Sequence, residues 1–288
     1  MMTYNELWRR LTDVYDDGEA RAITRLVLEE RFGMTLTDIV CGGVEALSAD
    51  DGRTLDQLFD RLAQAEPVQY VLGSETFAGR PFTVRPGTLI PRPETADLCA
   101  WVQLCAGSMK NPSEAKETGN KRILDIGTGT GCIAVTLSLE IPQAEVTAWD
   151  ISPIALQTAR ENAEKWDAKV NVVEQDALHA PADDKNRWDI IVSNPPYICD
   201  KERKDMERNV LEHEPSLALF VPDADPLLFY RHIAQYAVHA LAPQGLLFFE
   251  INPLYLDETR QMLQAKGFKD ITAKDDSFGK TRFVKATH

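Results

Sequence analysis

The chain has 288 residues, of which 44% are hydrophobic and 26% are charged, and its formal net charge is -14. These values are typical of a globular protein with one large or two smaller domains. The acidic charge disfavours a protein that holds duplex nucleic acid, because phosphate contacts need clustered Lys and Arg. A protein partner that carries basic residues remains compatible with it.

The cysteine and histidine patterns indicate reduced thiols and no metal site. The cysteines are odd in number and lack C-x-x-C spacing, and the histidines lack ligand spacing. The first residues, "MMTYNELWRR", lack the apolar run of a signal peptide, and no stretch approaches the length of a membrane span. We therefore expect a cytoplasmic protein without membrane contact. The five cysteines are Cys41, Cys99, Cys105, Cys132 and Cys199.

Residues 1–69 are expected to form a small helical-bundle domain. "NELWRRLTDVY" and "EARAITRLVLEERFG" place apolar residues at three- and four-residue spacing, and Gly33 is typical of a helix end. "TLTDIVCGG" and "DGRTLDQLFDRLAQAEP" indicate two shorter helices. Through Glu75 this segment has seven Arg, no Lys and fifteen acidic residues. Because it has no chemical motif of its own, its simplest role is that of a spacer or cap, whereas its acidic excess predicts that it docks a partner protein.

Residues 70–90 alternate in polarity and contain Gly and Pro, which predicts a β-hairpin linker. "IPRPETADL" then begins a helix, with Pro93 near its first turn and Glu94 at its positive end. The polar, turn-rich stretch from Ala106 to Lys121 is expected to be a solvent-exposed loop.

Residues 91–288 are predicted to form an α/β domain, because apolar strands alternate with helical patterns after Lys121. Such alternation indicates a mostly parallel sheet with both faces covered. The last two strands, "KDITAKDD" and "TRFVKAT", are close in sequence, so an antiparallel hairpin is expected at one edge of the sheet.

A glycine-rich turn follows the first of these strands in "ILDIGTGTG". Glycines let the backbone turn sharply and approach a ligand closely. NAD sites use a similar turn, but here the spacing is G-x-G-x-G rather than G-x-G-x-x-G. Asp125 lies at the strand end, where a carboxylate would repel a pyrophosphate and would suit a positively charged cofactor.

Two further carboxylates follow the next two strands. Asp150 closes "VTAWD", where it can accept hydrogen bonds from ribose hydroxyls, cap the helix that follows, or do both. Asp176 can accept from an adenine amino group, or is simply a solvated loop residue. The set resembles the S-adenosylmethionine site of Rossmann-like methyltransferases, which release S-adenosylhomocysteine. The implied cofactor-binding residues are Asp125, Gly127, Thr128, Gly129, Thr130, Gly131, Asp150, Ile151, Asp176, Ala177 and Asn194.

The stretch "IIVSNPPYI" places two prolines directly after a strand, which makes a rigid bend where ligand sites of α/β sheets lie. An ordinary turn is the simpler interpretation, but the motif resembles that of methyltransferases acting on planar nitrogens. The Asn194 side-chain oxygen and the Pro195 carbonyl can accept from the two N–H groups of an amide, while Pro196 adds rigidity. The Tyr197 ring can stack on a planar group. These four are the predicted catalytic and substrate-binding residues.

Four stretches together resemble the release-factor glutamine N5-methyltransferase family: Glu66–Leu98, "LDIGTGTGCIA", "VSNPPYI" and "LEHEPSLALF". "LIPRPET" is the most telling part, because generic adenine methyltransferases lack it. The family implies a helical N-terminal domain, a hairpin linker and a Rossmann-like catalytic domain. It also implies methylation of the glutamine in the Gly-Gly-Gln loop of class I peptide release factors.

The chain departs from the family pattern in two places. The family usually shows "RPETE", whereas here Ala96 and Asp97 follow Thr95. The family often shows "EIG" where this chain has "EINPLYLD", so the sequence assigns no role to Glu250–Asn252.

Two other functions compete with this one. An adenine-N6 methyltransferase of DNA or RNA needs a basic cleft and a target-reading module, whereas "KERKDMER" interleaves its basic residues with acids. A non-catalytic binding module is disfavoured because both the cofactor and the substrate signatures are complete. We expect a monomeric enzyme that does not bind nucleic acid directly.

Overall fold

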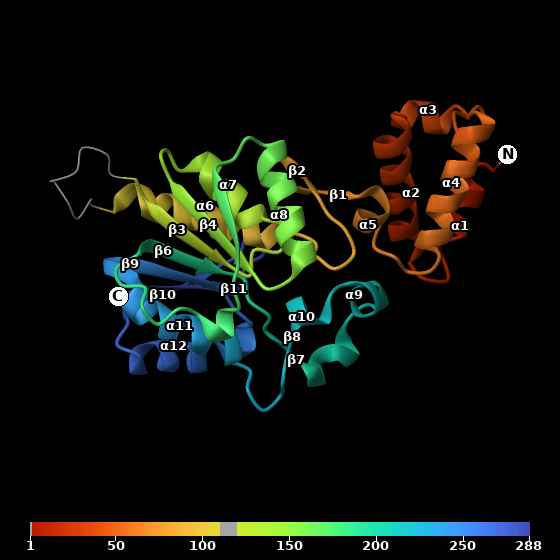
Figure 1. Ribbon diagram of the computed structural model, residues 1–288. Helices are drawn as coiled ribbons and strands as arrows, with labels where there is room; N and C mark the ends of the chain where they lie inside the picture. The colour runs from red at the N-terminus through yellow and green to blue at the C-terminus, as the bar shows by residue number, and fades with distance from the viewer. Residues whose placement is uncertain (1, 110–119) are drawn as a thin grey trace. The chain divides into compact units, whose positions relative to one another are not determined.

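The computed structural model describes residues 2–109 and 120–288, and it divides into two compact units (Figure 1). The helical unit comprises Met1–Ser74 with Met206–His213, and the sheet unit comprises Glu75–Asp205 with Glu214–His288. Most of the loop expected over residues 106–121 lies outside the described residues, and its first three residues belong to a helix.

The first four helices of the helical unit each begin at a residue whose side chain caps the helix. The Thr3 side chain and Glu6 form a capping box at the first helix, and Asp16 accepts from two backbone N–H groups at the start of the second. Gly33 ends that second helix with a left-handed φ of 66°. The helices are α1 (Tyr4–Arg9), α2 (Asp17–Phe32), α3 (Leu36–Val40), α4 (Ala49–Leu62), α5 (Val68–Leu72) and α9 (Arg208–His213).

The linker begins later than its sequence pattern predicts. Tyr70 and Val71 are buried in the short helix α5, which ends at Gly73 in the left-handed conformation. The hairpin itself consists only of β1 (Ser74–Phe77) and β2 (Arg80–Thr83). The prediction of a hairpin from residue 70 was wrong at its start, because burial of the two apolar side chains favours a helical turn there.

No pattern in the sequence indicates that Met206–His213 joins the helical unit. The preceding "KERKD" stretch lies in the mostly exposed 3-10 helix η2 (Asp200–Asp205), and α9 follows it. Within the helical unit, a ring nitrogen of His213 lies 3.1 Å from the carbonyl oxygen of Gln64. This unit is therefore assembled from two distant parts of the chain.

The sheet unit contains a seven-stranded sheet with the order β10-β11-β9-β6-β3-β4-β5. The pairs between β9, β6, β3, β4 and β5 are all parallel, while β11 is antiparallel to both β9 and β10. The predicted parallel sheet with an antiparallel edge hairpin is confirmed. The strands are β3 (Arg122–Ile126), β4 (Glu145–Asp150), β5 (Val170–Glu174), β6 (Trp188–Ser193), β9 (Leu241–Glu250), β10 (Lys269–Asp275) and β11 (Thr281–Thr287).

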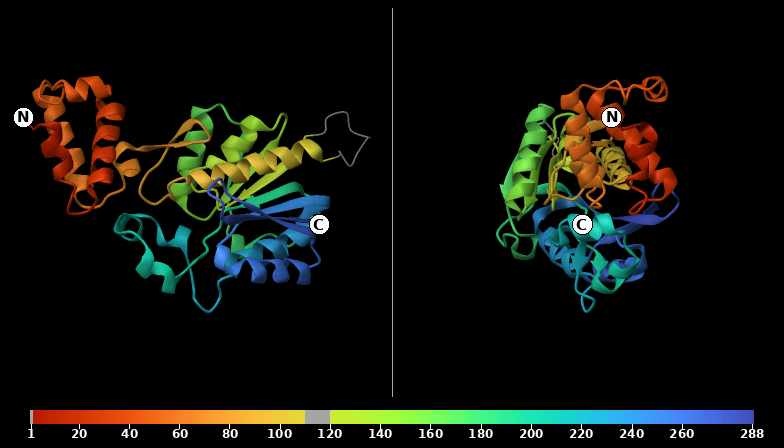
Figure 2. Two further views of the ribbon diagram at one scale, coloured as in Figure 1. Left: turned by 180° about the vertical axis from the view of Figure 1, so that it is seen from behind. Right: turned by 90° about the vertical axis from the view of Figure 1, so that its right-hand side faces the viewer.

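Helices cover both faces of this sheet (Figures 1 and 2). One layer contains α6 (Pro93–Ser108), α7 (Cys132–Glu140) and α8 (Pro153–Lys165). The other contains α11 (Leu228–Ala240) and α12 (Leu256–Ala265). Because both faces are buried, the central strands are continuous apolar runs instead of alternating ones.

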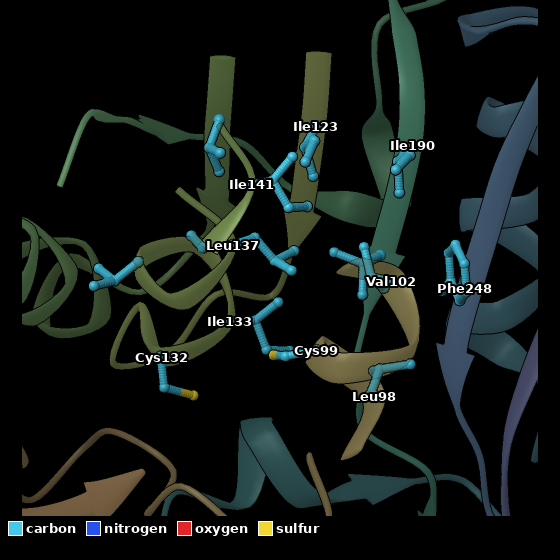
Figure 3. Close-up of a cluster of buried hydrophobic side chains, with 14 of the residues drawn as sticks. Leu98, Cys99, Val102, Ile123, Cys132, Ile133, Leu137, Ile141, Ile190 and Phe248 are labelled. Atoms are coloured by element: carbon cyan, nitrogen blue, oxygen red, sulfur yellow. The ribbon is translucent and has the colours of Figure 1, made fainter. Parts of the chain in front are cut away.

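Figure 3 shows the core under the first layer. Leu98 and Val102 of α6 and Leu137 of α7 pack beside Ile123 and Phe248 of the sheet. All five side chains are fully buried, which fixes α6 and α7 on β9 and on β3, the strand that ends at the glycine turn. Across the described ranges, no helix combines the length and the apolar character that crossing a membrane requires.

The last glycine of the glycine turn, Gly131, lies close to α8. Gly131 has a φ of 81°, and a Cβ atom there would lie 3.1 Å from the Cα and Cβ of Ala159. Gly267 has a similar φ of 91°, but no atom lies within 4 Å of its Cβ position. The two glycines therefore share a backbone conformation and differ in available space.

We predict that Gly131→Ala destabilises the protein more than Gly267→Ala does. Both variants bear a left-handed alanine, at a cost of roughly 1–2 kcal/mol, whereas only Gly131→Ala adds an overpacking cost of roughly 1–3 kcal/mol. Urea unfolding of the two variants measures the difference. Equal free energies of unfolding would show that the contact with Ala159 relaxes without cost.

Candidate active site

The glycine turn is bonded to the neighbouring strand. The N–H groups of Gly127 and Thr128 both donate to the Trp149 carbonyl oxygen at 2.9 Å. The N–H of Gly129, whose φ is 56°, donates to the Asp150 Oδ2 at 2.8 Å. These bonds hold the turn at the carboxyl end of β4, and positive φ makes glycine the favoured residue at position 129.

A cavity lies in the sheet unit at this end of the sheet, and most of the predicted site residues line it. Asp125, Gly131 and Tyr197 are not among its lining residues. Those that line it are Gly127, Thr128, Gly129, Thr130, Asp150, Ile151, Asp176, Ala177, Asn194, Pro195 and Pro196.

Asp150 presents a partly exposed carboxylate to the cavity. Its Oδ1 accepts from the Ser152 N–H at 2.9 Å, and its Oδ2 accepts from Gly129. Burial raises the pKa of Asp150, and the backbone donors Ser152 and Gly129 oppose that rise. Each carboxylate oxygen has two lone pairs, so both retain acceptor capacity toward a ligand.

Asp176 is the second carboxylate of the cavity. Its Oδ1 accepts from the Leu178 N–H at 2.8 Å, and its Oδ2 lies 2.6 Å from the His179 Nδ1. Burial raises the pKa of Asp176, but the hydrogen bonds from His179 and Leu178 outweigh it and leave the pKa lowered. The carboxylate is therefore favoured in its charged form beside Ala177.

Asp125 lies behind the glycine turn and is fully buried. Its Oδ2 accepts from the Thr128 hydroxyl at 2.6 Å, and its Oδ1 has no hydrogen-bond partner among the described residues. Burial raises the pKa of Asp125 to about 7, partly opposed by Thr128. Direct contact with a cofactor, as predicted from the sequence, has no support from this placement. The carboxylate instead orients Thr128, which does line the cavity.

The Asn-Pro-Pro-Tyr bend follows β6 directly. The side-chain nitrogen of Asn194 donates to the Thr95 Oγ1 at 3.2 Å, and Pro195 and Pro196 line the cavity. Within the described part of the chain, no donor is bonded to the Asn194 side-chain oxygen. An oriented amide with an available acceptor therefore stands at the cavity, beside the glycine turn.

The Tyr197 side chain does not line the cavity. Its hydroxyl donates to the Glu250 Oε1 at 3.2 Å, and its ring packs against the core under α11 and α12. The predicted stacking of this ring on a planar substrate group thus has no support from the cavity lining.

Glu250 does not line the cavity but contacts Thr95, which does, and the sequence assigned no role to it. It ends β9, is almost fully buried, and accepts from the Thr95 hydroxyl at 2.7 Å as well as from Tyr197. Burial raises its pKa to about 7, which the Thr95 and Tyr197 hydroxyls and the Arg282 charge oppose. The available signal was a single glutamate directly after the apolar run "GLLFF".

Glu214 is a second missed residue, from the stretch "LEHEPSLALF". Its buried carboxylate accepts from the Arg92 guanidinium at 2.5 Å and from the Ile90 N–H at 3.1 Å. Arg92 and Pro215 both line the cavity. This ion pair therefore connects "LIPRPET" and "HEPSLAL" at one wall of the site. Across the described residues, no group of three or more His, Cys, Asp or Glu is placed to hold a metal ion.

Comparison with known proteins gives matches over nearly the whole chain. A family model described as "PrmC N-terminal domain" matches residues 4–73, and one described as "Methyltransferase small domain" matches residues 108–216. A release factor glutamine methyltransferase of Bacteroides thetaiotaomicron is 45% identical over 96% of this chain and 95% of its own. One of Flavobacterium psychrophilum is 39% identical over 96% of this chain and 94% of its own.

The fold also resembles solved structures. A 16S rRNA methyltransferase of T. thermophilus, in complex with AdoMet and guanosine, aligns with a TM-score of 0.51 and 20% identity. The alignment covers 74% of this chain and 49% of that one. At this identity the likeness concerns the fold alone, and it supports the Rossmann-like arrangement of the sheet unit.

The buried Asp125 predicts a pH-dependent stability. Its pKa is about 7 in the folded protein against an ordinary value of 3.8, so the folded state binds more protons between these pH values. Stability from this group is therefore lost as the pH rises from about 4 to about 7, by at most about 1.4 kcal/mol per pH unit. Asp125→Asn cannot titrate and should escape this loss.

Urea unfolding of the wild type and of Asp125→Asn at about pH 5 and about pH 8 tests the sign of the effect. The variant should gain stability relative to the wild type at the higher pH, since the contributions of other groups cancel in the difference. A difference that does not change with pH would contradict the burial of an ionisable carboxylate here.

Proposed function

Because the chain belongs to the release factor glutamine methyltransferase family, we propose that it methylates the side-chain amide nitrogen of the Gly-Gly-Gln glutamine in class I peptide release factors. The observation that carries the proposal is the side-chain oxygen of Asn194. It is an available acceptor at the cavity, adjacent to a glycine turn flanked by two carboxylates.

The proposed methyl donor is S-adenosylmethionine, and the cavity fits it. No atom lies within 4 Å of the Cβ positions of Gly127 and Gly129, so the backbone of the turn is open to a close ligand. Asp150 has acceptor capacity for ribose hydroxyls, and Asp176 can accept from an adenine amino group. The cavity carboxylates also suit a positively charged ligand. The cofactor supplies an activated methyl group.

The residues of the enzyme must orient the side-chain amide of the substrate glutamine. An amide nitrogen is a poor nucleophile because its lone pair is delocalised into the carbonyl group. Acceptors on both of its N–H groups can fix its position and favour pyramidalisation. We assign these acceptor roles to the Asn194 Oδ1 and the Pro195 carbonyl, since both residues line the cavity. We assign Pro196 the role of keeping this bend rigid, and Tyr197 the role of anchoring Glu250.

Adenine methylation is the less favoured function. The relatives that match almost the full chain are named for glutamine methylation of release factors. The chain's net charge of -14 also opposes a role that requires many phosphate contacts.

We predict that Asn194→Ala lowers kcat on a release factor by roughly 10²–10³, as expected for loss of a preorganised polar contact in the transition state. Asp150→Ala serves as the comparison, because it should act on cofactor binding and weaken it by roughly 1–3 kcal/mol. Methyl transfer from labelled cofactor gives kcat, and calorimetry gives cofactor affinity. Asn194→Ala with full kcat and a lowered melting temperature would show that the bend only ends a strand.

We also propose that the helical unit docks the release factor. The residues of the helical unit include sixteen Asp and Glu against eight Arg and no Lys, which suits a basic surface on the partner. Among the described residues, those that line the cavity all belong to the sheet unit, so we assign recognition of the partner to the helical unit. We propose a monomer that acts in the cytoplasm, where release factors operate.

Charge reversal of exposed acids in the helical unit should raise KM for intact release factor several-fold while kcat stays unchanged, because docking precedes the chemical step. The test variant is Glu30→Lys with Glu45→Lys, and the control is Asp183→Lys in the sheet unit, all at exposed positions. A short Gly-Gly-Gln peptide should be methylated equally by all of them. An equal KM for the test and control variants on intact release factor would remove the helical unit from docking.

A further inference from the structure

The Thr95 hydroxyl connects Asn194 to the buried Glu250. It donates to the Glu250 Oε2 at 2.7 Å and accepts from the Asn194 Nδ2 at 3.2 Å. Thr95 lies in the first turn of α6 and is buried, and Glu250 ends β9. Three segments that are far apart in the chain therefore meet in one chain of hydrogen bonds behind the acceptor.

When Glu250 is ionised, its carboxylate determines the direction of these bonds, because it has no proton to donate. Tyr197 donates to the Glu250 Oε1 while Thr95 donates to Oε2, so both oxygens act as acceptors. A hydroxyl has one proton to donate, and Thr95 uses it on Glu250. Toward Asn194 the Thr95 oxygen can then only accept. The amide of Asn194 must present its nitrogen to Thr95, which leaves its oxygen for another donor.

This polarity matters for an amide substrate. The two ends of an Asn side chain have nearly the same shape, and only hydrogen bonds distinguish them. Turned the wrong way, Asn194 would present its N–H groups to the N–H groups of the substrate. An arrangement with donors facing donors loses the acceptor and misplaces the reacting nitrogen.

We propose that Thr95 and Glu250 are positioning residues that fix the orientation of the Asn194 amide, so that its oxygen accepts from the substrate glutamine. The inference rests on the proposed function, in which Asn194 is the acceptor. It also gives a role to the threonine of "LIPRPET" and to Glu250, for which the sequence indicates none.

The experiment compares three threonine variants of the full chain. Thr95→Val removes the hydroxyl at constant shape, and Thr95→Ser keeps it. Thr259→Val is the matched control, because Thr259 is a fully buried threonine of α12 whose hydroxyl donates to the Tyr255 carbonyl at 2.7 Å, outside the site. Measurements are kcat on a release factor, cofactor affinity by calorimetry, and melting temperature.

Thr95→Val should lower kcat by about 10-fold or more with cofactor affinity unchanged, as expected for a misplaced catalytic group. Thr95→Ser should restore kcat to near the wild-type value, and Thr259→Val should lose stability alone. A Thr95→Val enzyme with normal kcat, or a Thr95→Ser enzyme as slow as Thr95→Val, would overturn the proposal.

Glu250→Met gives a second route if Thr95→Val does not fold. A methionine removes both carboxylate oxygens, which frees the Thr95 proton for the Asn194 oxygen and allows the amide to turn the wrong way, so kcat should again fall by about 10-fold or more. Normal kcat in Glu250→Met would overturn the proposal. If Asn194→Ala itself keeps full kcat, the acceptor role fails instead, and the two failures are thus distinguished.

Discussion

The site depends on the parallel register of three neighbouring strands. β3 lies between β4 and β6, and its last residue, Ile126, pairs with Trp149 on one side and Ser193 on the other. The glycine turn, Asp150 and the Asn-Pro-Pro-Tyr bend therefore lie side by side at the carboxyl ends of these strands. Parallel strands are joined by crossover helices, and the burial of those helices on both faces of the sheet holds the strand ends in register. The glycine turn, Asp150 and the Asn194 amide are all placed by that arrangement.

Two buried carboxylates hold threonine hydroxyls in position next to the cavity, and both carboxylates are costly to ionise. Burial raises the pKa of Asp125 and of Glu250 to about 7. Each accepts from a threonine hydroxyl: Asp125 from Thr128 of the glycine turn, and Glu250 from Thr95 beside the bend. A buried charge weakens the fold, so its presence at these two positions fits a positioning role better than a stabilising one.

The parts of the fold that could be predicted are those with local signals. The strand and helix periods, the glycine turn and the edge hairpin each follow from a short stretch, and the structure contains all of them. The contacts of Glu250 could not be predicted, because Thr95 lies 155 residues away and only tertiary packing joins them. For the same reason, the ring of Tyr197 was expected at the substrate but packs in the core. The helical turn at Tyr70 was missed because burial overrode the alternating pattern.

We expect this cavity to direct a methyl group to a glutamine side-chain amide. Mass spectrometry of a class I release factor after incubation with the enzyme and S-adenosylmethionine, with fragmentation of the Gly-Gly-Gln peptide, tests this expectation. The glutamine side chain should gain one methyl group, and no gain should occur when Asn replaces that glutamine. An unmodified glutamine, together with methyl transfer to adenine in nucleic acid, would contradict this expectation.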